Sequence, residues 1–112
     1  MKYALLINER PDAYIGLDAE ERAAISAEYA VLRDDPRVLG GERLQPGDTA
    51  TTIRAQDGQL LLTDGPFADT KEIFGGFYLI EAADIDSALE LAAKLPALRL
   101  GGSVEVRPLV DR

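Results

Sequence analysis

Apolar residues along this chain fall into short runs typical of strands and into two stripes with helical spacing. Strands are predicted at residues 2–8, 38–44, 50–55, 60–63, 77–82 and 103–108. Helices are predicted between Asp18 and Pro36 and between Asp84 and Pro96. Asp18, with Glu21 three residues later, predicts a capping box, and Asp84 predicts a second helix cap.

The order of these elements predicts the fold class. It reads strand, helix, strand, hairpin, strand, helix, strand, and Asp57-Gly58 marks the hairpin turn. Without the hairpin, two split βαβ units remain. We therefore expect one α+β domain over residues 1–112, with a ferredoxin-like βαββαβ fold and an inserted β-hairpin.

Two of the predicted strands are apolar on both faces. In residues 2–8, Tyr3, Leu5 and Ile7 point one way, whereas Ala4 and Leu6 point the other. Residues 77–82 show the same pattern, except for Glu81. Two helices cover only one face of a four-stranded sheet, and each Å² of apolar area left in water costs about 25 cal/mol. We therefore expect a homodimer that packs sheet face against sheet face.

Composition excludes several classes of function. The net charge of −8 disfavours nucleic acid as a partner, and no apolar run is long enough to span a membrane. The absence of cysteine fits a cytoplasmic protein, and the absence of histidine excludes Ser/His/Asp and Cys/His catalysis. The spacing of the acidic residues matches no calcium loop, so we expect no metal and no cofactor.

The stretch from residue 61 to residue 80 holds the densest set of candidate functional residues. Asp64-Gly65-Pro66 breaks an apolar run, because Gly65 and Pro66 restrict the backbone. Asp69 and Glu72 predict the capping box of a single helical turn, which Gly75-Gly76 would stop. The loop would bring several charged side chains together at one end of a sheet, where functional residues are often found.

Asp64 is the leading candidate for acid–base chemistry. A carboxylate placed against Phe67 would be desolvated, which raises its pKa toward the range that a general base needs. Alternatively, Asp64 caps its own turn through its side chain, as aspartate before glycine commonly does.

The other candidates also have two interpretations each. Lys71 pairs with Glu72, binds an anion or is solvated. Arg107 either binds a carboxylate or is a cross-strand partner of Glu81 or Glu105. Tyr78 either points into a cleft or packs its ring locally. Gly75-Gly76 either lets a ligand approach the backbone or forms a bulge or helix stop.

Beyond these patterns, the chain resembles the YCII-related proteins, in the branch named for its Asp-Gly-Pro-Phe motif. The likeness rests on Thr63-Asp64-Gly65-Pro66-Phe67, Lys71-Glu72 and Gly75-Gly76-Phe77. It extends to Met1-Lys2-Tyr3, Leu44-Gln45-Pro46, Thr51-Thr52-Ile53-Arg54 and Gly102-Ser103-Val104-Glu105-Val106-Arg107-Pro108.

The resemblance implies a dimeric α+β barrel of ferredoxin-like subunits, in a superfamily whose enzymes act on small, often cyclic, substrates. It also implies that the motif residues named above belong to the site. The family's suspected His–Asp pair cannot be carried over, because this chain has no histidine.

Two functions follow as hypotheses, and the sequence leaves open whether the protein is an enzyme. In the first, the dimer binds or transforms a small anionic or cyclic molecule at an Asp64-centred site. In the second, it is a non-catalytic protein-interaction module. The second accords with the family's frequent association with sigma factors of the extracytoplasmic-function type.

Overall fold

The fold was analysed in a computed structural model that describes residues 1–65 and 71–111. Four strands form the main sheet: β1 (Lys2–Glu9), β2 (Val38–Arg43), β5 (Ile73–Glu81) and β6 (Ser103–Pro108). Their order is β2-β5-β1-β6, and each neighbouring pair is antiparallel. With the two crossing helices described next, this is the ferredoxin-like arrangement, so the predicted fold is confirmed.

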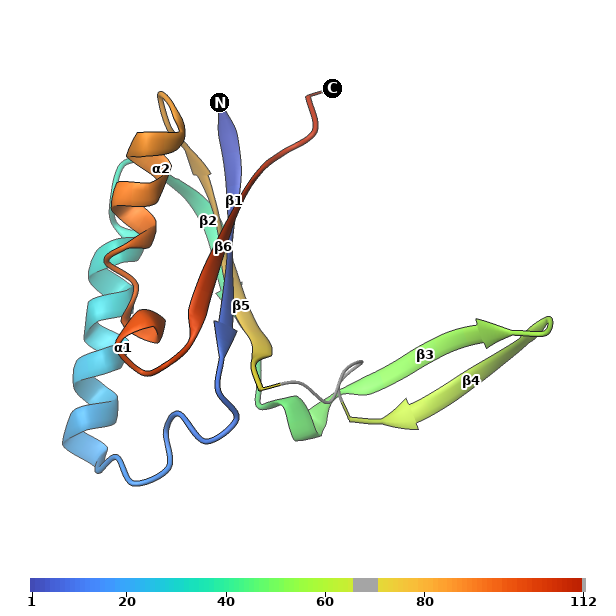
Figure 1. Cartoon of the computed structure of the whole chain (residues 1–112). Coiled ribbons are helices and arrows are strands. Elements are labelled where there is room, and N and C mark those ends of the chain that lie inside the picture. The colour runs from blue at the N-terminus through green and yellow to red at the C-terminus, as the bar shows by residue number, and fades with distance from the viewer. Residues whose placement is uncertain (66–70, 112) are drawn as a thin grey trace.

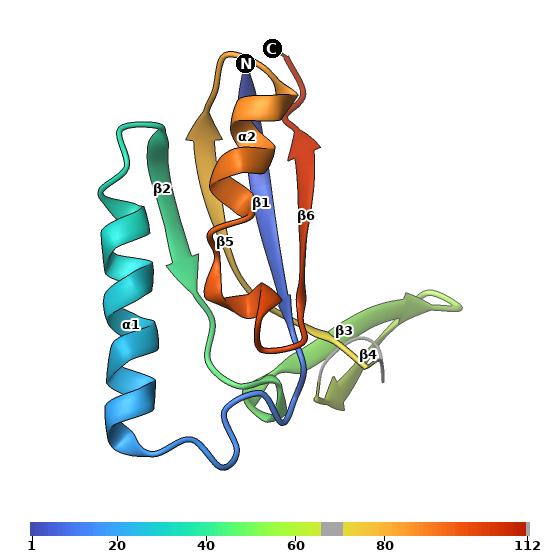
Figure 2. The same cartoon turned by 60° about the vertical axis from the view of Figure 1, so that its left-hand side comes forward.

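Two helices lie on the same side of the sheet (Figures 1 and 2). They are α1 (Ala19–Arg33) and α2 (Ile85–Ala92), and a short 3₁₀ helix, η2 (Pro96–Leu98), follows α2. Asp18 accepts from the Glu21 backbone at 2.8 Å, and the Glu21 carboxylate accepts from the Asp18 backbone at 3.3 Å. This confirms the predicted capping box. Asp84 accepts from the Ser87 backbone at 2.9 Å, which confirms the second cap.

The core lies between the helices and one face of the sheet. Its largest fully buried side chains are those of Tyr3, Leu5, Ile80, Leu91 and Pro96. On the opposite face of the central strands, the side chains of Ala4, Leu6, Phe77 and Leu79 are only half-buried. The chain's own helices therefore leave one apolar sheet face open, as the alternation of residues in these strands predicts.

β5 begins earlier than the sequence predicts, and the predicted helix stop at Gly75-Gly76 is wrong. Both glycines lie inside β5, because β1 and β2 extend far enough to pair with this segment. A Cβ on Gly76 would lie 2.8 Å from the Glu42 carbonyl oxygen, so glycine allows the two strands to approach closely. The helical turn predicted from Asp69 falls outside the described residues.

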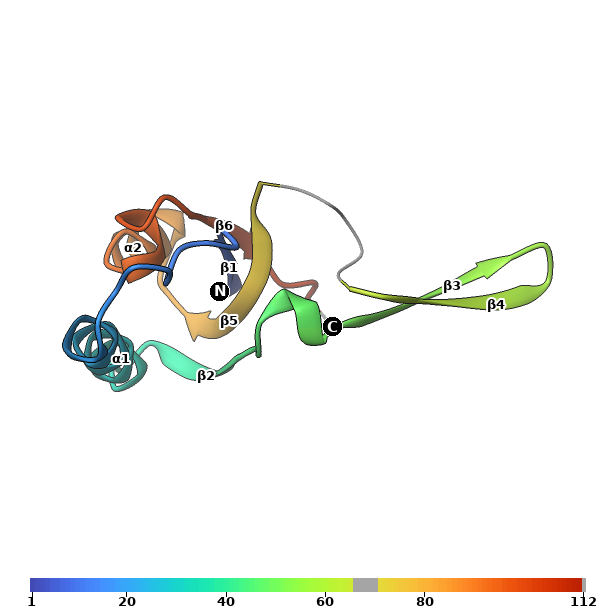
Figure 3. The ribbon, with the colours of Figure 1, turned by 90° about the horizontal axis from the view of Figure 1, so that it is seen from below.

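A second, two-stranded sheet projects from the body of the molecule on the side away from the helices (Figures 1 and 3). It consists of β3 (Thr51–Gln56) and β4 (Gln59–Asp64), and the short helix η1 (Gly47–Thr49) precedes it. Asp57 and Gly58 turn the chain with φ of 53° and 78°, which confirms the predicted hairpin. We call residues 51–64 the arm.

The helices are too short or too polar for a membrane: within the described residues, none could span one.

Candidate functional site

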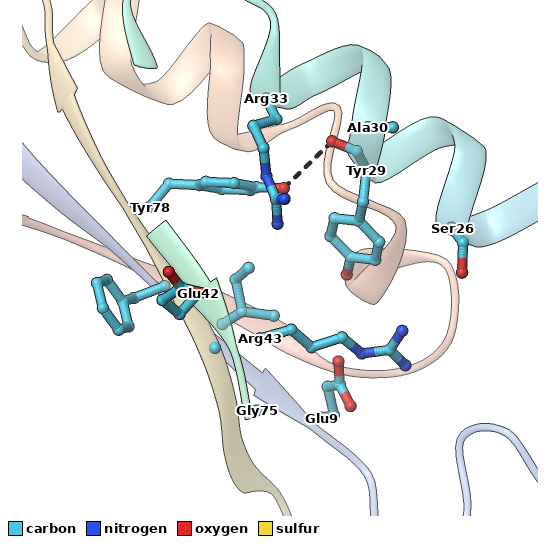
Figure 4. A pocket seen from close by; sticks show the side chains of 12 residues that line it. Glu9, Ser26, Tyr29, Ala30, Arg33, Glu42, Arg43, Gly75 and Tyr78 are labelled. Carbon is cyan, nitrogen blue, oxygen red and sulfur yellow. Dashed lines mark hydrogen bonds between the residues drawn. The ribbon is translucent and has the colours of Figure 1, made fainter. Parts of the chain in front are cut away.

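A cavity of about 200 Å³ lies between α1 and the end of the sheet where β1 and β2 finish and β5 begins (Figure 4). Residues of α1 form one wall and residues of the three strands form the other. The lining residues are Ile7, Glu9, Ser26, Tyr29, Ala30, Arg33, Glu42, Arg43, Gly75, Gly76, Phe77 and Tyr78.

Two tyrosines give the cavity aromatic walls. Tyr78 projects from β5 and is buried, and its hydroxyl donates to the Tyr29 carbonyl oxygen at 3.3 Å. This bond ties the middle of β5 to α1, and the dashed line in Figure 4 marks it. Burial raises the pKa of both tyrosine hydroxyls, so both stay neutral at physiological pH.

The Tyr29 hydroxyl is buried and finds no hydrogen-bond partner among the described residues. Its pKa is raised chiefly by burial, and the nearby Ala97 backbone opposes that rise. Because this oxygen is buried, Tyr29 presents its ring rather than its hydroxyl to a ligand in the cavity.

Glu9, Tyr14 and Arg43 form the charged cluster at the mouth of the cavity. The Tyr14 hydroxyl donates to Glu9 Oε1 at 3.2 Å, and Arg43 Cζ lies 5.2 Å from the centre of the Tyr14 ring. Burial, and then the charge of Glu9, raises the pKa of Tyr14, whereas Arg43 lowers it. Tyr14 is positioned by Arg22, whose Nη2 donates to the Tyr14 carbonyl oxygen at 2.7 Å.

Strand alternation decides which charges reach the cavity. Arg43 pairs with Gly76 and Glu42 pairs with Phe77, so consecutive side chains of β2 point to opposite faces of the sheet. Arg43 turns toward α1, and the Glu42 side chain turns away. Arg33 from α1, Arg43 and Glu9 then give the cavity two cationic groups and one anionic group.

Gly75 makes room for the Glu9 carboxylate. A Cβ on Gly75 would lie 2.8 Å from Glu9 Cδ. The register between β1 and β5 shifts after Ile7 and skips Gly75, and Glu9 then pairs with Ile73. This irregularity matches the bulge predicted as one alternative for Gly75-Gly76. The glycine therefore allows the carboxylate to lie flat against the sheet.

The cavity continues into a wider groove of about 1030 Å³. Four residues line both: Glu9, Ser26, Arg43 and Gly75. The groove also touches Arg10, Pro11, Tyr14 and Ile15, which lie between β1 and α1, and residues 44–48, which lead from β2 toward the arm. A ligand of the cavity would thus enter past Tyr14 and Arg43.

Three of the residues predicted from the sequence line the cavity, namely Gly75, Gly76 and Tyr78. Five others lie elsewhere: Asp64, Gly65, Lys71, Glu72 and Arg107 are absent from the described lining residues of both cavity and groove. Pro66 and Phe67 fall outside the described residues.

Asp64 is exposed at the end of β4, opposite Thr51. Beside it, the Gly65 backbone has φ of 101°, donates to the Ala50 carbonyl oxygen at 2.7 Å and accepts from the Thr52 hydroxyl at 2.8 Å. These bonds fasten the end of the arm. The role of Asp64 in acid–base chemistry stays a prediction.

The remaining predicted residues lie on the surface or near the sheet edge. Lys71 is exposed, and Glu72 is half-buried and accepts from the Ser103 hydroxyl on β6. Arg107 is exposed and pairs with Glu105 on its own strand, at 2.5 Å. Glu105 is one of the two glutamates predicted as its partner, although the pair forms along β6 and not between strands.

Sequence reasoning missed Glu9, Tyr14, Arg33 and Arg43, and it placed Tyr29 only in the apolar stripe of a helix. Their separation along the chain conceals that they meet at one cavity, and no motif joins them. In the described residues, no group of three or more His, Cys, Asp or Glu side chains could hold a metal ion.

Comparisons with known proteins bear on this site. The family model described as "YCII-related domain" matches residues 1–111. An uncharacterized protein of Rhizobium meliloti (strain 1021) is 50% identical over 68 residues, which are 60% of this chain and 55% of that protein. The match therefore spans about half the length of that relative.

A solved structure is similar over the whole chain. It is 5-chloro-2-hydroxyhydroquinone dehydrochlorinase from Burkholderia phenoliruptrix AC1100, in complex with 2,5-dihydroxybenzoquinone. The TM-score is 0.54 and the sequence identity 18%, and the match covers 100% of this chain and 96% of that one. At this identity, the likeness shows the fold alone.

Proposed function

This chain belongs to the YCII-related domain family, and from that premise we propose that it binds a small, ring-shaped, anionic molecule in the cavity between α1 and the sheet. The observation that carries the proposal is the lining of this cavity. Aromatic rings from Tyr29 and Tyr78 stand beside the guanidinium groups of Arg33 and Arg43. Such walls suit a flat ring with a negatively charged oxygen.

The size of the cavity limits the ligand. At about 200 Å³, it is smaller than the roughly 300–1,000 Å³ that pockets for drug-sized molecules occupy. A single six-membered ring with a few substituents is the class that we propose. The structurally similar dehydrochlorinase is named for a hydroxylated ring and holds 2,5-dihydroxybenzoquinone, which supports this choice of ligand class.

The probe for the test is 2,5-dihydroxybenzoquinone, titrated into the protein by isothermal calorimetry, with the contact residues mapped by NMR chemical shifts. R33Q and R43Q should each weaken binding by about tenfold, because each removes a charged partner of the anion. R107Q is the matched control, since Arg107 is exposed, pairs with Glu105 and does not line the cavity. It should leave the dissociation constant within about twofold.

Two results would overturn the proposal. One is shift changes that map away from α1 and β5. The other is an equal loss of affinity in R107Q and R43Q, which would point to unspecific attraction between the anion and any surface arginine.

We also propose that the protein is a homodimer through the open face of the sheet. The half-buried side chains of Ala4, Leu6, Phe77 and Leu79 support this, because they form an uncharged centre on that face. The charges of Glu105 and Arg107 stand on β6 at its edge and pair with each other. An apolar centre with a polar rim is the usual anatomy of an interface. The alternative of a regulatory protein-interaction module stays a prediction.

A further inference from the structure

The arm lies apart from the two helices that pack on the main sheet (Figure 1). A two-stranded hairpin is marginally stable in water unless its faces are packed against something else. The arm projects from the body of the molecule on the side away from both helices, so neither α1 nor α2 covers it (Figures 1 and 3).

One face of the arm is apolar. Ile53 pairs with Leu62, and Ala55 pairs with Leu60, so these four side chains share a face. We call them the apolar face of the arm. Ile53 is 59% exposed, Leu60 is 70% exposed and Leu62 is 69% exposed. Adjacent large side chains this open to water are unusual in a finished assembly.

The whole chain shows the same excess of surface. A compact folded protein of 12.1 kDa exposes about 6,000 Å². This chain exposes 7814 Å². Its radius of gyration is 15.8 Å, against about 13 Å for a compact domain of this length. The surplus is roughly 1,800 Å² a copy, which is enough surface to form an interface of the size that obligate homodimers have.

The direction in which the arm projects indicates that its partner is a second copy of this chain. The arm projects on the same side as the open sheet face (Figure 1). A second copy stacked on that face would therefore lie beside the arm, and a two-fold axis would place the second arm beside the first copy. Each chain carries a net charge of −8, so contact between two copies is favoured through uncharged surfaces. The four side chains of the apolar face of the arm and the centre of the open sheet face are uncharged, and Asp64, which pairs with Thr51, lies on the same face of the arm at its base.

We propose that the apolar face of the arm packs against a second copy of this chain, so that two arms clasp a symmetric dimer. This inference rests on the homodimer proposed above, and it adds the arm as a second element that stabilises the dimer. The dimer then has two contact regions in each chain, the open sheet face and the arm.

The register of the hairpin provides a matched pair of variants. L60D/L62D places two charges on the apolar face of the arm, whereas L61D places one on the opposite face, where Leu61 pairs with Arg54. Sedimentation equilibrium should show a dimer for the wild type and for L61D. For L60D/L62D the dissociation constant should rise by about 100-fold or more. Because the arm stands clear of the core, the helical signal in far-UV circular dichroism should be unchanged in all three proteins.

L79E, on the open sheet face, distinguishes between two outcomes: that the arm does not contact the second copy, and that no homodimer forms. A monomeric wild type would overturn both proposals. A dimer that L79E dissociates and L60D/L62D leaves intact would overturn the clasp alone. The same holds for a wild-type dimer whose arm amides exchange hydrogen as fast as those of an isolated hairpin, since the arm would then be uncovered in the dimer.

Discussion

Arg37 and Asp35 form a bidentate ion pair at the turn between α1 and β2. Nε donates to Oδ1 at 3.0 Å, and Nη2 donates to Oδ2 at 2.9 Å. The same guanidinium donates through Nη1 to the Ser87 carbonyl oxygen at 3.1 Å and to Glu90 Oε2 at 3.0 Å. One arginine thus joins the start of β2 to α2, far apart in the chain.

This ion pair predicts acid sensitivity. Hydrogen bonds from Arg37 lower the pKa of Asp35 from 3.8 to about 2. A carboxylate with a lowered folded-state pKa contributes stability that is fully present above its unfolded value and is lost as pH falls through the folded value. D35N should therefore lower the free energy of unfolding by about 1 kcal/mol at pH 6, with less difference from the wild type as pH falls from about 4 to 2.

Urea unfolding at fixed protein concentration measures this effect. D57N is a suitable control, because Asp57 is exposed in the hairpin turn with φ of 53°, a conformation that asparagine also adopts. A difference between D35N and the wild type that stays constant from pH 6 to pH 2 would contradict the prediction.

The two cavity tyrosines should respond oppositely to loss of their hydroxyls. Y29F removes a buried hydroxyl that has no partner in the described residues, so stability should be unchanged or rise by up to about 1 kcal/mol. Y78F removes the donor to the Tyr29 carbonyl oxygen and should cost about 1 kcal/mol. Thermal unfolding of the two variants tests this, and an equal loss in both would contradict it.

The glycines of the main sheet should differ sharply in their tolerance of alanine. In G76A the new Cβ would lie 2.8 Å from the Glu42 carbonyl oxygen, and backbone cannot easily move aside. We expect a loss of about 2 kcal/mol or more. G40A is the matched control, because a Cβ there meets nothing within 4 Å, and its stability should change by less than about 0.5 kcal/mol. Similar melting temperatures for the two variants would show that β2 shifts freely.

G75A should affect ligand binding more than stability. Its Cβ would meet the flexible end of Glu9 at 2.8 Å, so the carboxylate can move away. That movement would break the contact between Glu9 and Tyr14 at the mouth of the cavity. We expect the affinity for 2,5-dihydroxybenzoquinone to change by about threefold or more, with a melting temperature closer to wild type than that of G76A. An unchanged affinity would remove Glu9 from the site.

Asp64 is the residue that the sequence motif favours most as a member of the site, and the D64N variant tests that role. It is exposed and does not line the cavity, so D64N should leave the dissociation constant of the same probe within about twofold. A loss of affinity without a change in melting temperature would instead bring Asp64 into the site, as its place in the Asp-Gly-Pro-Phe motif predicts.

Local chemistry explains why most elements could be predicted. The caps at Asp18 and Asp84 and the turn at Asp57-Gly58 depend on neighbours within a few residues. The start of β5 could not be predicted in this way. Gly75-Gly76 has weak strand propensity, and its place in the sheet depends on β1 and β2, which are distant in sequence.

The candidate site divides in the same manner. Gly75, Gly76 and Tyr78 were found because they stand together in one apolar stretch and line the cavity. Glu9, Arg33 and Arg43 come from β1, α1 and β2. In the sequence, each of them alone is typical of an ordinary charged surface residue. Nothing in their spacing indicates that strand alternation turns Arg43 toward α1 and Glu42 away.

The sequence by itself determined the order of the elements, the ferredoxin-like class and the presence of an uncovered apolar sheet face, because periodicity and capping act over a few residues. Only the tertiary structure decided where the cavity lies, which charges enter it and that the hairpin stands away from the body. Those features depend on contacts between segments distant in sequence, whose geometry is fixed when the sheet assembles.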